Sequence, residues 1–473
     1  MISTHRNWRR PGWAVRLLAL LAVLGYGLTL KPPQILGNDS PAYLNAAYHL
    51  LHHGTFSEAS TDTPTLPTIG REPGYGLFLA GVMALDPWLG QYRPSCASET
   101  APCPPSTYRS SQWLNGGLIA AAGLALFQAL RLANLPVAVA TTAAVYLLAN
   151  VQAASSRHSV ASDYLALFLV CLILLAIARA ARRPGFGRGA LVGGALAALT
   201  LVKGVFLVLA LATLPAALIL GAVLKPARRV VLVPALAATL VYGAVVGGWM
   251  ERNRSLSGDF ALTDSRSGMA LSTREVFNHM TPIEYVVAMV YWTRGCGDGL
   301  ARGWFAPELW RPFRIEQPGG YFDRGEHGYF PRVSRAMTEL GLDRAAAIKR
   351  VDGELKQAIL DRPLTHVLAT VPVFYRGLWI DEAIVFGLPA LVWAMVAMIR
   401  RRRWLAVVLL LPGVFNLLFY ALISLNIPRY QITAMPTLAL AAGLALPELV
   451  AWLRRLNPLN KEKYQPSATS NRS

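Results

Sequence analysis

The sequence predicts an all-α, multi-pass membrane protein. Of its 473 residues, 54% are hydrophobic and only 15% are charged. Several uninterrupted apolar runs approach the roughly 20 residues that an α-helix needs to cross a bilayer. Pairs or clusters of basic residues interrupt these runs, as is typical of the cytoplasmic ends of transmembrane helices. These clusters are Arg9-Arg10, Arg182-Arg183, Arg228-Arg229, Arg400 to Arg403 and Arg454-Arg455.

About ten apolar segments are expected to be transmembrane helices. They lie near residues 14–30, 112–131, 136–154, 160–180, 189–202, 204–224, 229–249, 381–399, 404–425 and 430–453. The two segments on either side of Lys203-Gly204 could instead form one long bent helix, but the basic loops near residues 185 and 226 favour two crossings. The first segment has no small-residue cleavage site after it, so we expect it to remain as an anchor.

The basic clusters also predict the orientation of the chain. If the N-terminus is cytoplasmic, each cluster lies inside, and the two long polar segments lie outside. The net charge of +19 could indicate nucleic acid as a partner, but its position at helix ends favours a topological role. We therefore expect a cytoplasmic (inner) membrane protein, with both termini cytoplasmic, that contacts membrane lipids and no nucleic acid.

The predicted organisation follows from these spans. Residues 1–30 form the cytoplasmic N-terminus and first helix, 31–111 a first outer loop, and 112–249 helices two to seven. Residues 250–380 form a large outer loop folded over the active face, 381–453 the last three helices, and 454–473 a disordered cytoplasmic tail.

Both outer loops are expected to carry amphipathic surface helices. In the first loop, Ser40 is a suitable N-cap before Pro41, and Gly54 is placed to end that helix. A second surface or shallowly inserted helix is expected over residues 73–89, and one or two surface helices over residues 334–361.

Four cysteines occur in the chain. Cys96 and Cys103 share the first outer loop, where either a disulfide or two free thiols would fit. Cys171 is expected in the core, and Cys296 has no evident partner. Neither a zinc-binding spacing nor a phosphate-binding glycine loop is present, and Asp298 has no cluster of acids around it. We expect no metal and no other cofactor.

Several short motifs resemble one family in their order along the chain. They are Asn38-Asp39-Ser40-Pro41-Ala42-Tyr43, Gly54-Thr55-Phe56, Arg71-Glu72-Pro73-Gly74-Tyr75, Ser162-Asp163-Tyr164-Leu165, Trp249-Met250-Glu251-Arg252-Asn253 and Pro428-Arg429-Tyr430. The set resembles GT-C-fold, polyprenyl-phosphate-dependent glycosyltransferases, similar to protein mannosyltransferases and lipid A aminoarabinose transferases. The resemblance implies a GT-C-like helix bundle whose active site lies on the periplasmic or extracytoplasmic face.

Asp39 matches the acidic residue that serves as catalytic base in that family. An acceptor hydroxyl must lose a proton as it attacks the anomeric carbon, and a nearby carboxylate can accept it. Family members often carry an acidic pair where this chain has Asp39-Ser40, so Asp39 lacks an adjacent carboxylate. The alternative interpretation of Asp39 is a helix-capping acid. Glu72 is a second candidate acid, which could equally be a charge at a proline-initiated helix start.

Cations at the outer ends of helices are candidates for binding the phosphate of the donor. The predicted set, with an accompanying tyrosine and acid, is Lys203, Arg157, His158, Arg252, Arg429, Tyr430 and Asp163. Lys203 could instead snorkel to the headgroups, Arg429 could be an interfacial anchor, and Arg157 and His158 could lie in a solvated loop. Asp163 is expected to orient one of these cations by an ion pair.

The resulting hypothesis is an inverting membrane glycosyltransferase. It would move a sugar from a polyprenyl-monophosphate-linked donor to a lipid, cell-envelope glycan or protein acceptor. Neither the sugar nor the acceptor can be read from motifs, because the shape of the pocket selects both. The alternatives are a transporter or flippase of glycoconjugates, which would concentrate polar residues near the membrane midplane, and a non-catalytic assembly protein.

Overall fold

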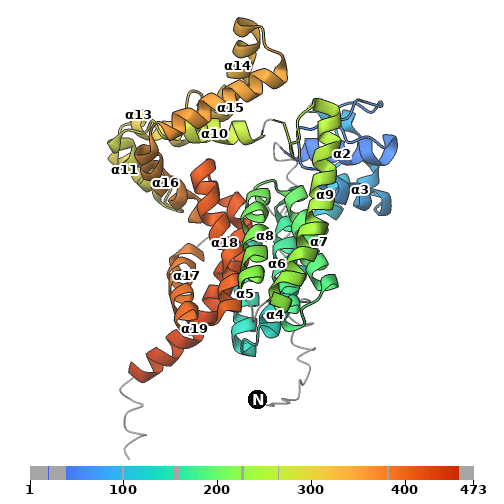
Figure 1. The fold of residues 1–473 in the computed structure, drawn as a ribbon. Helices are drawn as coiled ribbons and strands as arrows, with labels where there is room; N and C mark the ends of the chain where they lie inside the picture. Colours follow the sequence, from blue (N-terminus) through green and yellow to red (C-terminus); the bar gives the residue numbers. More distant parts are fainter. Residues whose placement is uncertain are drawn as a thin grey trace, which may run out of the picture.

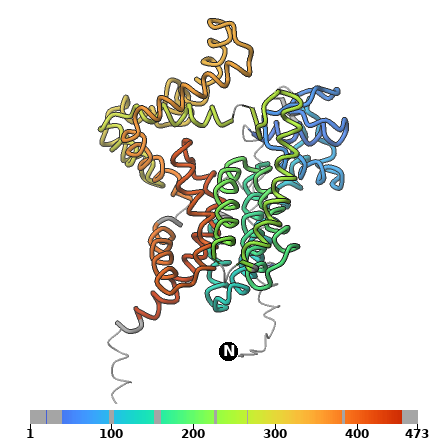
Figure 2. Tube along the Cα trace, in the orientation of Figure 1, coloured from blue at the N-terminus to red at the C-terminus, as the bar shows by residue number. Residues whose placement is uncertain are grey.

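The computed structural model describes residues 20, 39–98, 101–153, 160–224, 228–264, 266–380 and 383–456. The predicted first apolar span, apart from Leu20, and the polar tail from Asn457 therefore lie outside the described residues, as do Arg157 and His158. Figures 1 and 2 show a helix bundle, a segment formed by residues 39–108 beside one end of it, and an arm formed by residues 266–380 that extends past the same end.

The bundle contains every described segment that was predicted to span the membrane. Its helices are α4 (Arg109–Leu132), α5 (Val137–Ala153), α6 (Asp163–Arg182), α7 (Phe186–Val202), α8 (Phe206–Val223), α9 (Val233–Ser257), α17 (Ala383–Arg400), α18 (Trp404–Ile423) and α19 (Met435–Leu456). A π-helical turn, η6 (Arg228–Leu232), precedes α9, and a 3-10 segment, η8 (Pro428–Ala434), precedes α19.

The bundle helices have the length and composition of membrane helices. Among the described residues, six candidate spans are long and apolar enough to cross a bilayer, whereas α5, α7 and the apolar part of α17 are shorter. The protein is therefore all-α and of a multi-pass membrane type. The predicted total of about ten crossings stays a prediction.

Small residues let the bundle helices approach one another closely. An added Cβ at Gly189 or Gly193 of α7 would collide with the backbone of α9 at Pro234 and Ala238. Similarly, a Cβ at Gly443 of α19 would lie 2.6 Å from the Val139 carbonyl oxygen of α5. Such contacts are typical of membrane helices, because close backbone packing replaces the hydrophobic driving force that acts in water.

Lys203 separates two helices, as predicted. Helix α7 ends at Val202, Lys203 has an extended backbone, and α8 begins at Phe206. The segment between them lies at the end of the bundle that carries residues 39–108, and we call this the site end.

The segment of residues 39–108 packs against the site end. Its elements are α2 (Ser40–His53), α3 (Pro73–Leu85), η1 (Leu89–Gln91), η2 (Pro94–Cys96), β1 (Ala97–Ser98), β2 (Ala101–Pro102) and η3 (Pro105–Tyr108). The two short strands pair antiparallel, with Ala97 opposite Pro102. Gly54 ends α2 with a positive φ of 64°, as the sequence predicted. The second predicted helix ends earlier than expected, at Leu85, because Asp86 is extended and its carboxylate accepts backbone hydrogen bonds from Trp88 and Leu89.

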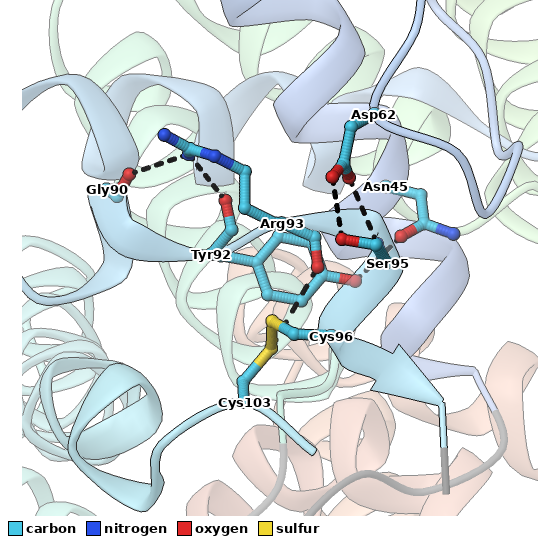
Figure 3. The surroundings of a disulfide bond; sticks show 8 residues. All are labelled: Asn45, Asp62, Gly90, Tyr92, Arg93, Ser95, Cys96 and Cys103. Atoms are coloured by element: carbon cyan, nitrogen blue, oxygen red, sulfur yellow. Dashed lines mark hydrogen bonds between the residues drawn. A yellow bond between two sulfur atoms is a disulfide. The ribbon is translucent and has the colours of Figure 1, made fainter. Parts of the chain in front are cut away.

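Two details of this segment settle points that the sequence left open or placed wrongly. Cys96 and Cys103 form a disulfide, which closes the loop around the short strands (Figure 3). Ser40 is the first helical residue of α2 rather than its N-cap, and its hydroxyl donates 2.7 Å to the Val160 carbonyl oxygen instead of capping the helix. Cys171 is buried and Cys296 is exposed, and both are free thiols.

The arm consists of short helices and one longer pair. Its elements are α10 (Arg266–Phe277), α11 (Pro282–Tyr291), α12 (Gly297–Trp304), α13 (Pro307–Trp310), η7 (Arg311–Phe313), α14 (Tyr321–Leu340), α15 (Arg344–Leu360) and α16 (Pro363–Leu378). The helices expected over residues 334–361 are the end of α14 and all of α15, separated at Gly341, which has a positive φ of 64°. An aromatic core that includes Phe277, Trp292, Phe313 and Tyr321 joins α10 to α14 and α16. Helix α15 packs on α14 through a separate cluster that includes Tyr329, Val351 and Leu355.

Candidate functional site

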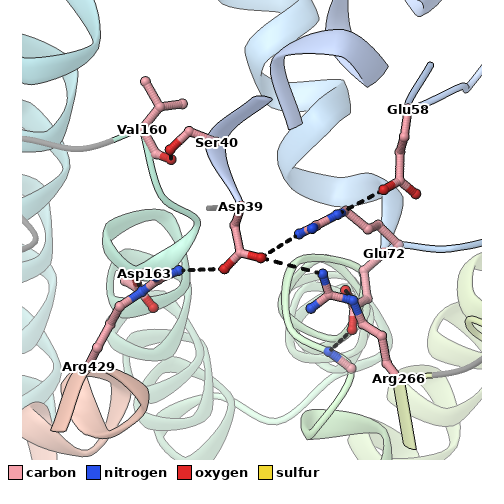
Figure 4. Close-up of polar contacts among 10 residues, drawn as sticks. Asp39, Ser40, Glu58, Glu72, Val160, Asp163, Arg266 and Arg429 are labelled. Atoms are coloured by element: carbon pink, nitrogen blue, oxygen red, sulfur yellow. Dashed lines mark hydrogen bonds and ion pairs between the residues drawn. The ribbon is translucent and has the colours of Figure 1, made fainter. Parts of the chain in front are cut away.

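Asp39 lies at the centre of a network of charges where α2, the bundle and the arm meet (Figure 4). Its carboxylate accepts hydrogen bonds of 2.9 Å from Arg71 and 3.1 Å from Arg429, and it lies 3.9 Å from the guanidinium of Arg266. Although Asp39 occupies the N-cap position of α2, its side chain makes no capping hydrogen bond. The helix-capping interpretation of Asp39 is therefore wrong, because its carboxylate accepts hydrogen bonds from arginines instead of from the backbone of α2.

These contacts set the protonation state of Asp39. Burial by itself raises the pKa of the carboxyl, since the charged form loses its hydration. The positive charges of Arg71, Arg429 and Arg266 outweigh burial and lower the pKa to about 2. Asp39 is thus an anion at neutral pH, held as one member of an ion-pair network.

Asp163 links two of the predicted cations. Its side chain is fully buried, with Lys203 Nζ 2.6 Å from Oδ1 and Arg429 Nε 2.7 Å from Oδ2. The expected ion pair of Asp163 is therefore present, and with two partners rather than one. Lys203 also lies 5.8 Å from the centre of the Tyr430 ring. Arg429 bridges Asp39 and Asp163, so residues from α2, α6, η8 and the α7–α8 junction meet at one point.

Glu72 and Arg266 form a second branch of the network. The Glu72 carboxylate accepts a 3.1 Å hydrogen bond from the backbone N–H of Gly204, and it lies 4.0 Å from Arg266. Helix α3 reaches this position because Gly74 has no side chain, since a Cβ there would lie 2.7 Å from the Leu201 carbonyl. Glu72 is the N-cap residue of α3, directly before Pro73, so it is a charge at a proline-initiated helix start, as the alternative interpretation held; its side chain makes no cap hydrogen bond.

Arg71, Glu58 and Arg266 are site residues that we did not single out from the sequence. Arg71 Nε donates 2.9 Å to Glu58, and the Arg71 guanidinium lies 4.9 Å from the Tyr43 ring centre. The positive-inside rule contained a usable signal for both arginines, because each is a cation in a segment predicted to lie outside. No local pattern distinguishes Glu58 from other acids in the connector.

A network of buried amides positions Arg429. The backbone carbonyl of Tyr430 accepts 3.2 Å from Asn416, and the Asn416 amide also donates 2.9 Å to Gln431. Gln431 in turn donates to Asn426, which adopts a positive φ of 49° and donates 3.0 Å to the Val373 carbonyl of the arm. This network fixes η8 between the bundle and the arm, so Arg429 is held in place by a rigid backbone.

The network is electrically balanced as it stands. Its cations are Arg71, Arg266, Arg429 and Lys203, and its carboxylates are Asp39, Glu58, Glu72 and Asp163. Four positive charges thus meet four negative charges. An anion that enters has to compete with a carboxylate of the protein for its hydrogen-bond donors.

A further carboxylate faces this network from the arm. Burial and, to a smaller extent, the negative charge of Asp39 raise the pKa of Glu326 on α14 above its ordinary value, against the lowering effect of Arg266 and His327. Within the described residues, no group of three histidine, cysteine, aspartate or glutamate side chains could hold a metal ion.

Arg252, a third predicted cation, does not join the network. Arg252 donates 2.9 Å to the Thr68 carbonyl and 2.9 Å to the Asn253 side chain, and it stacks 4.5 Å from the Trp249 ring. It therefore fixes the connector between α2 and α3. Arg157 and His158 lie outside the described residues.

Comparison with known proteins adds no family to this geometry. No protein-family model matches the chain, and no curated protein matches it significantly.

Proposed function

We propose that the protein is a membrane glycosyltransferase that moves a sugar from a polyprenyl monophosphate to an acceptor, with inversion at the anomeric carbon. The acceptor is a lipid, a cell-envelope glycan or a protein, and the site end faces the extracytoplasmic side of the cytoplasmic membrane. The observation that supports this proposal is the direct contact between Asp39 and Arg429 beside Lys203. A potential base and two potential phosphate-binding cations lie within one hydrogen-bonded chain.

The ion pairs of Asp39 suggest how the donor activates it. With a pKa of about 2, the carboxylate is a weak base, whereas an efficient general base has a pKa nearer the working pH. A donor phosphate that accepts hydrogen bonds from Arg429 draws this cation away from Asp39. The pKa of Asp39 then rises, and its carboxylate can accept the proton of the acceptor hydroxyl.

The reaction then balances without a covalent intermediate. The acceptor oxygen forms a bond to the anomeric carbon as the bond from that carbon to the phosphate oxygen breaks. The departing polyprenyl phosphate keeps the electron pair, and Arg429 and Lys203 stabilise the charge that develops on it.

The test is sugar transfer by the purified protein in lipid, with candidate polyprenyl-phosphate sugars as donors. Asp39→Asn keeps the shape of the side chain and removes the base, so we expect transfer to fall by about 10²- to 10⁴-fold. Asp62→Asn is the matched control, because Asp62 lies in the same segment but its carboxylate accepts hydrogen bonds from the backbone and hydroxyl of Ser95 instead of from arginines. Equal turnover by wild type and Asp39→Asn would remove Asp39 as the base. Movement of intact lipid-linked sugar across vesicles, without release of polyprenyl phosphate, would favour a flippase instead.

A further inference from the structure

Arg376 is a buried cation next to the candidate site and outside its ion-pair network. It lies near the end of α16, is 7% exposed, and stacks with its guanidinium carbon 4.9 Å from the Trp292 ring centre. Within the described residues its side chain makes one hydrogen bond, from Nη1 to the Leu425 carbonyl oxygen, and this bond is long at 3.5 Å. No carboxylate in the described part of the chain lies within ion-pair distance of it.

The indole of Trp292 shares this lack of partners. Its Nε1–H is buried and has no acceptor. A buried donor without an acceptor destabilises a fold, and a buried charge without a partner destabilises it more. Consistent with this cost, burial lowers the pKa of Arg376 to about 10, although the phenols of Tyr291 and Tyr430 act in the opposite direction.

The other buried arginine of the arm shows what a structural arginine looks like here. Among the described residues Arg274, which is fully buried, also has no carboxylate partner. It donates bonds of 2.6 to 2.7 Å to Asn278, the His366 carbonyl and Thr370, although its Nε has no acceptor there. Arg376, by contrast, uses one of its five N–H donors in the same part of the chain. The hydrogen bonds of Arg274 explain its burial as a purely structural feature, whereas the contacts of Arg376 do not explain its burial in this way.

Arg376 is adjacent to the ion-pair network through Tyr430. The Tyr430 phenol acts electrostatically on Arg376, and the same ring lies 5.8 Å from Lys203 Nζ. Tyr430 also follows Arg429 directly in η8. Every cation of the network already has a carboxylate partner. Arg376 is therefore the neighbouring cation whose charge is available to bind an anion.

We propose that Arg376 and the Trp292 indole N–H form an anion subsite for a lipid-linked phosphate. The guanidinium and the indole would each donate to phosphate oxygens, which gives an acceptor to the buried indole N–H and a counter-ion to the guanidinium. Two sources carry this chemistry, namely the polyprenyl phosphate of the donor and an anionic phospholipid. Assignment to the donor rests on the proposed function, whereas the subsite itself does not.

Binding measurements test the subsite without requiring turnover. The full-length protein in phosphatidylcholine nanodiscs is titrated with polyprenyl monophosphate, and with uncharged polyprenol as the control for the tail. Loss of a charge-assisted hydrogen bond is expected to weaken binding of the monophosphate by Arg376→Gln about 10- to 100-fold. Trp292→Phe keeps an aromatic ring under the guanidinium and removes the N–H, so it should weaken binding several-fold even if Arg376→Gln does not fold.

Arg302→Gln is the matched control. Arg302 also stacks on a tryptophan of the arm, 5.3 Å from the Trp310 ring centre, but it is exposed and paired with Asp298. We expect the affinity of the Arg302→Gln variant for the monophosphate to stay within twofold of wild type. If Trp292→Phe and every folded Arg376 variant also stay within twofold, the subsite is refuted.

A second titration series distinguishes the two sources. Nanodiscs that contain phosphatidylglycerol compete with the monophosphate if the subsite takes any lipid phosphate, and do not compete if it is selective for the donor. Both competition and its absence agree with the subsite, provided that binding of the monophosphate depends on Arg376. Sugar transfer is measured separately, so absence of transfer with Arg376-dependent binding would refute the proposed function and leave the subsite standing.

Discussion

Asp163→Asn is the substitution that tests the ion-pair network most directly. Asp163 is completely buried and holds Lys203 at 2.6 Å and Arg429 at 2.7 Å. The asparagine is nearly the same size but neutral, so Lys203 loses the one ion-pair partner that it has among the described residues, whereas Arg429 retains Asp39 at 3.1 Å. The substitution therefore leaves one buried ammonium unpaired and one guanidinium half-paired.

The burial of this pair sets the expected magnitude. Removing one partner of a buried ion pair costs about 3–5 kcal/mol, because the remaining charge has lost both its hydration and its counter-ion. Asp298→Asn is the matched control, since Asp298 and Arg302 are also 2.6 Å apart but 51% and 55% exposed. Exposed pairs contribute about 0–1 kcal/mol. The two substitutions thus differ in burial at equal distance.

The assay is equilibrium unfolding in mixed micelles, followed by circular dichroism. Asp163→Asn should lower the free energy of unfolding by several times the effect of Asp298→Asn. Adding Lys203→Met to Asp163→Asn should restore part of the loss, because it removes the unpaired ammonium. If Asp163→Asn is no more destabilising than Asp298→Asn, the burial argument for the network is wrong.

Three further predictions follow from other contacts. The pKa of Asp39 in the fold, about 2, lies below its ordinary value of 3.8, so its ion pairs stabilise the protein above that value; the difference in Tm between wild type and Asp39→Asn should shrink as the pH falls toward 2. Reduction of the Cys96–Cys103 disulfide, which spans a sequence separation of 7, should lower the free energy of unfolding by roughly 2 kcal/mol, whereas reductant should not affect the Cys96→Ser/Cys103→Ser variant. Gly193→Ala should destabilise by about 1–3 kcal/mol, because its methyl group collides with the α9 backbone at Ala238, whereas Gly194→Ala, with only Val241 at 3.8 Å, should be tolerated; equal Tm values for the two glycine variants would contradict the close packing of α7 on α9.

The sequence located most elements of the bundle correctly. Each described segment that was predicted to span the membrane coincides with a helix, and the break at Lys203 falls between α7 and α8. These features are local, because the insertion of an apolar run depends on its own residues and a helix makes its backbone hydrogen bonds within itself. For the same reason Gly54 was recognised as the end of α2.

The sequence also named several members of the charge network, but not their partners. Asp39 and Arg429 were candidates because they match positions of the family that the motifs resemble, and Lys203 because it is a charge beside apolar helices. Glu72 was a second candidate acid, and Asp163 was expected to pair with one of the cations. Their roles depended on contacts that span up to 390 residues of chain, as between Asp39 and Arg429. The tertiary structure alone therefore replaced the capping interpretation of Asp39 with ion pairs.

Composition and hydrophobic pattern by themselves determined the class of protein and the approximate positions of its helices. Only the tertiary structure decided that Arg71, Arg266 and Glu58 join the network and that Arg252 does not. It also decided that Arg376 has no counter-ion in the part of the chain that the structure describes. The physical reason is that helix formation depends on residues a few positions apart. Compensation of a buried charge depends on which distant segments the fold brings within about 4 Å.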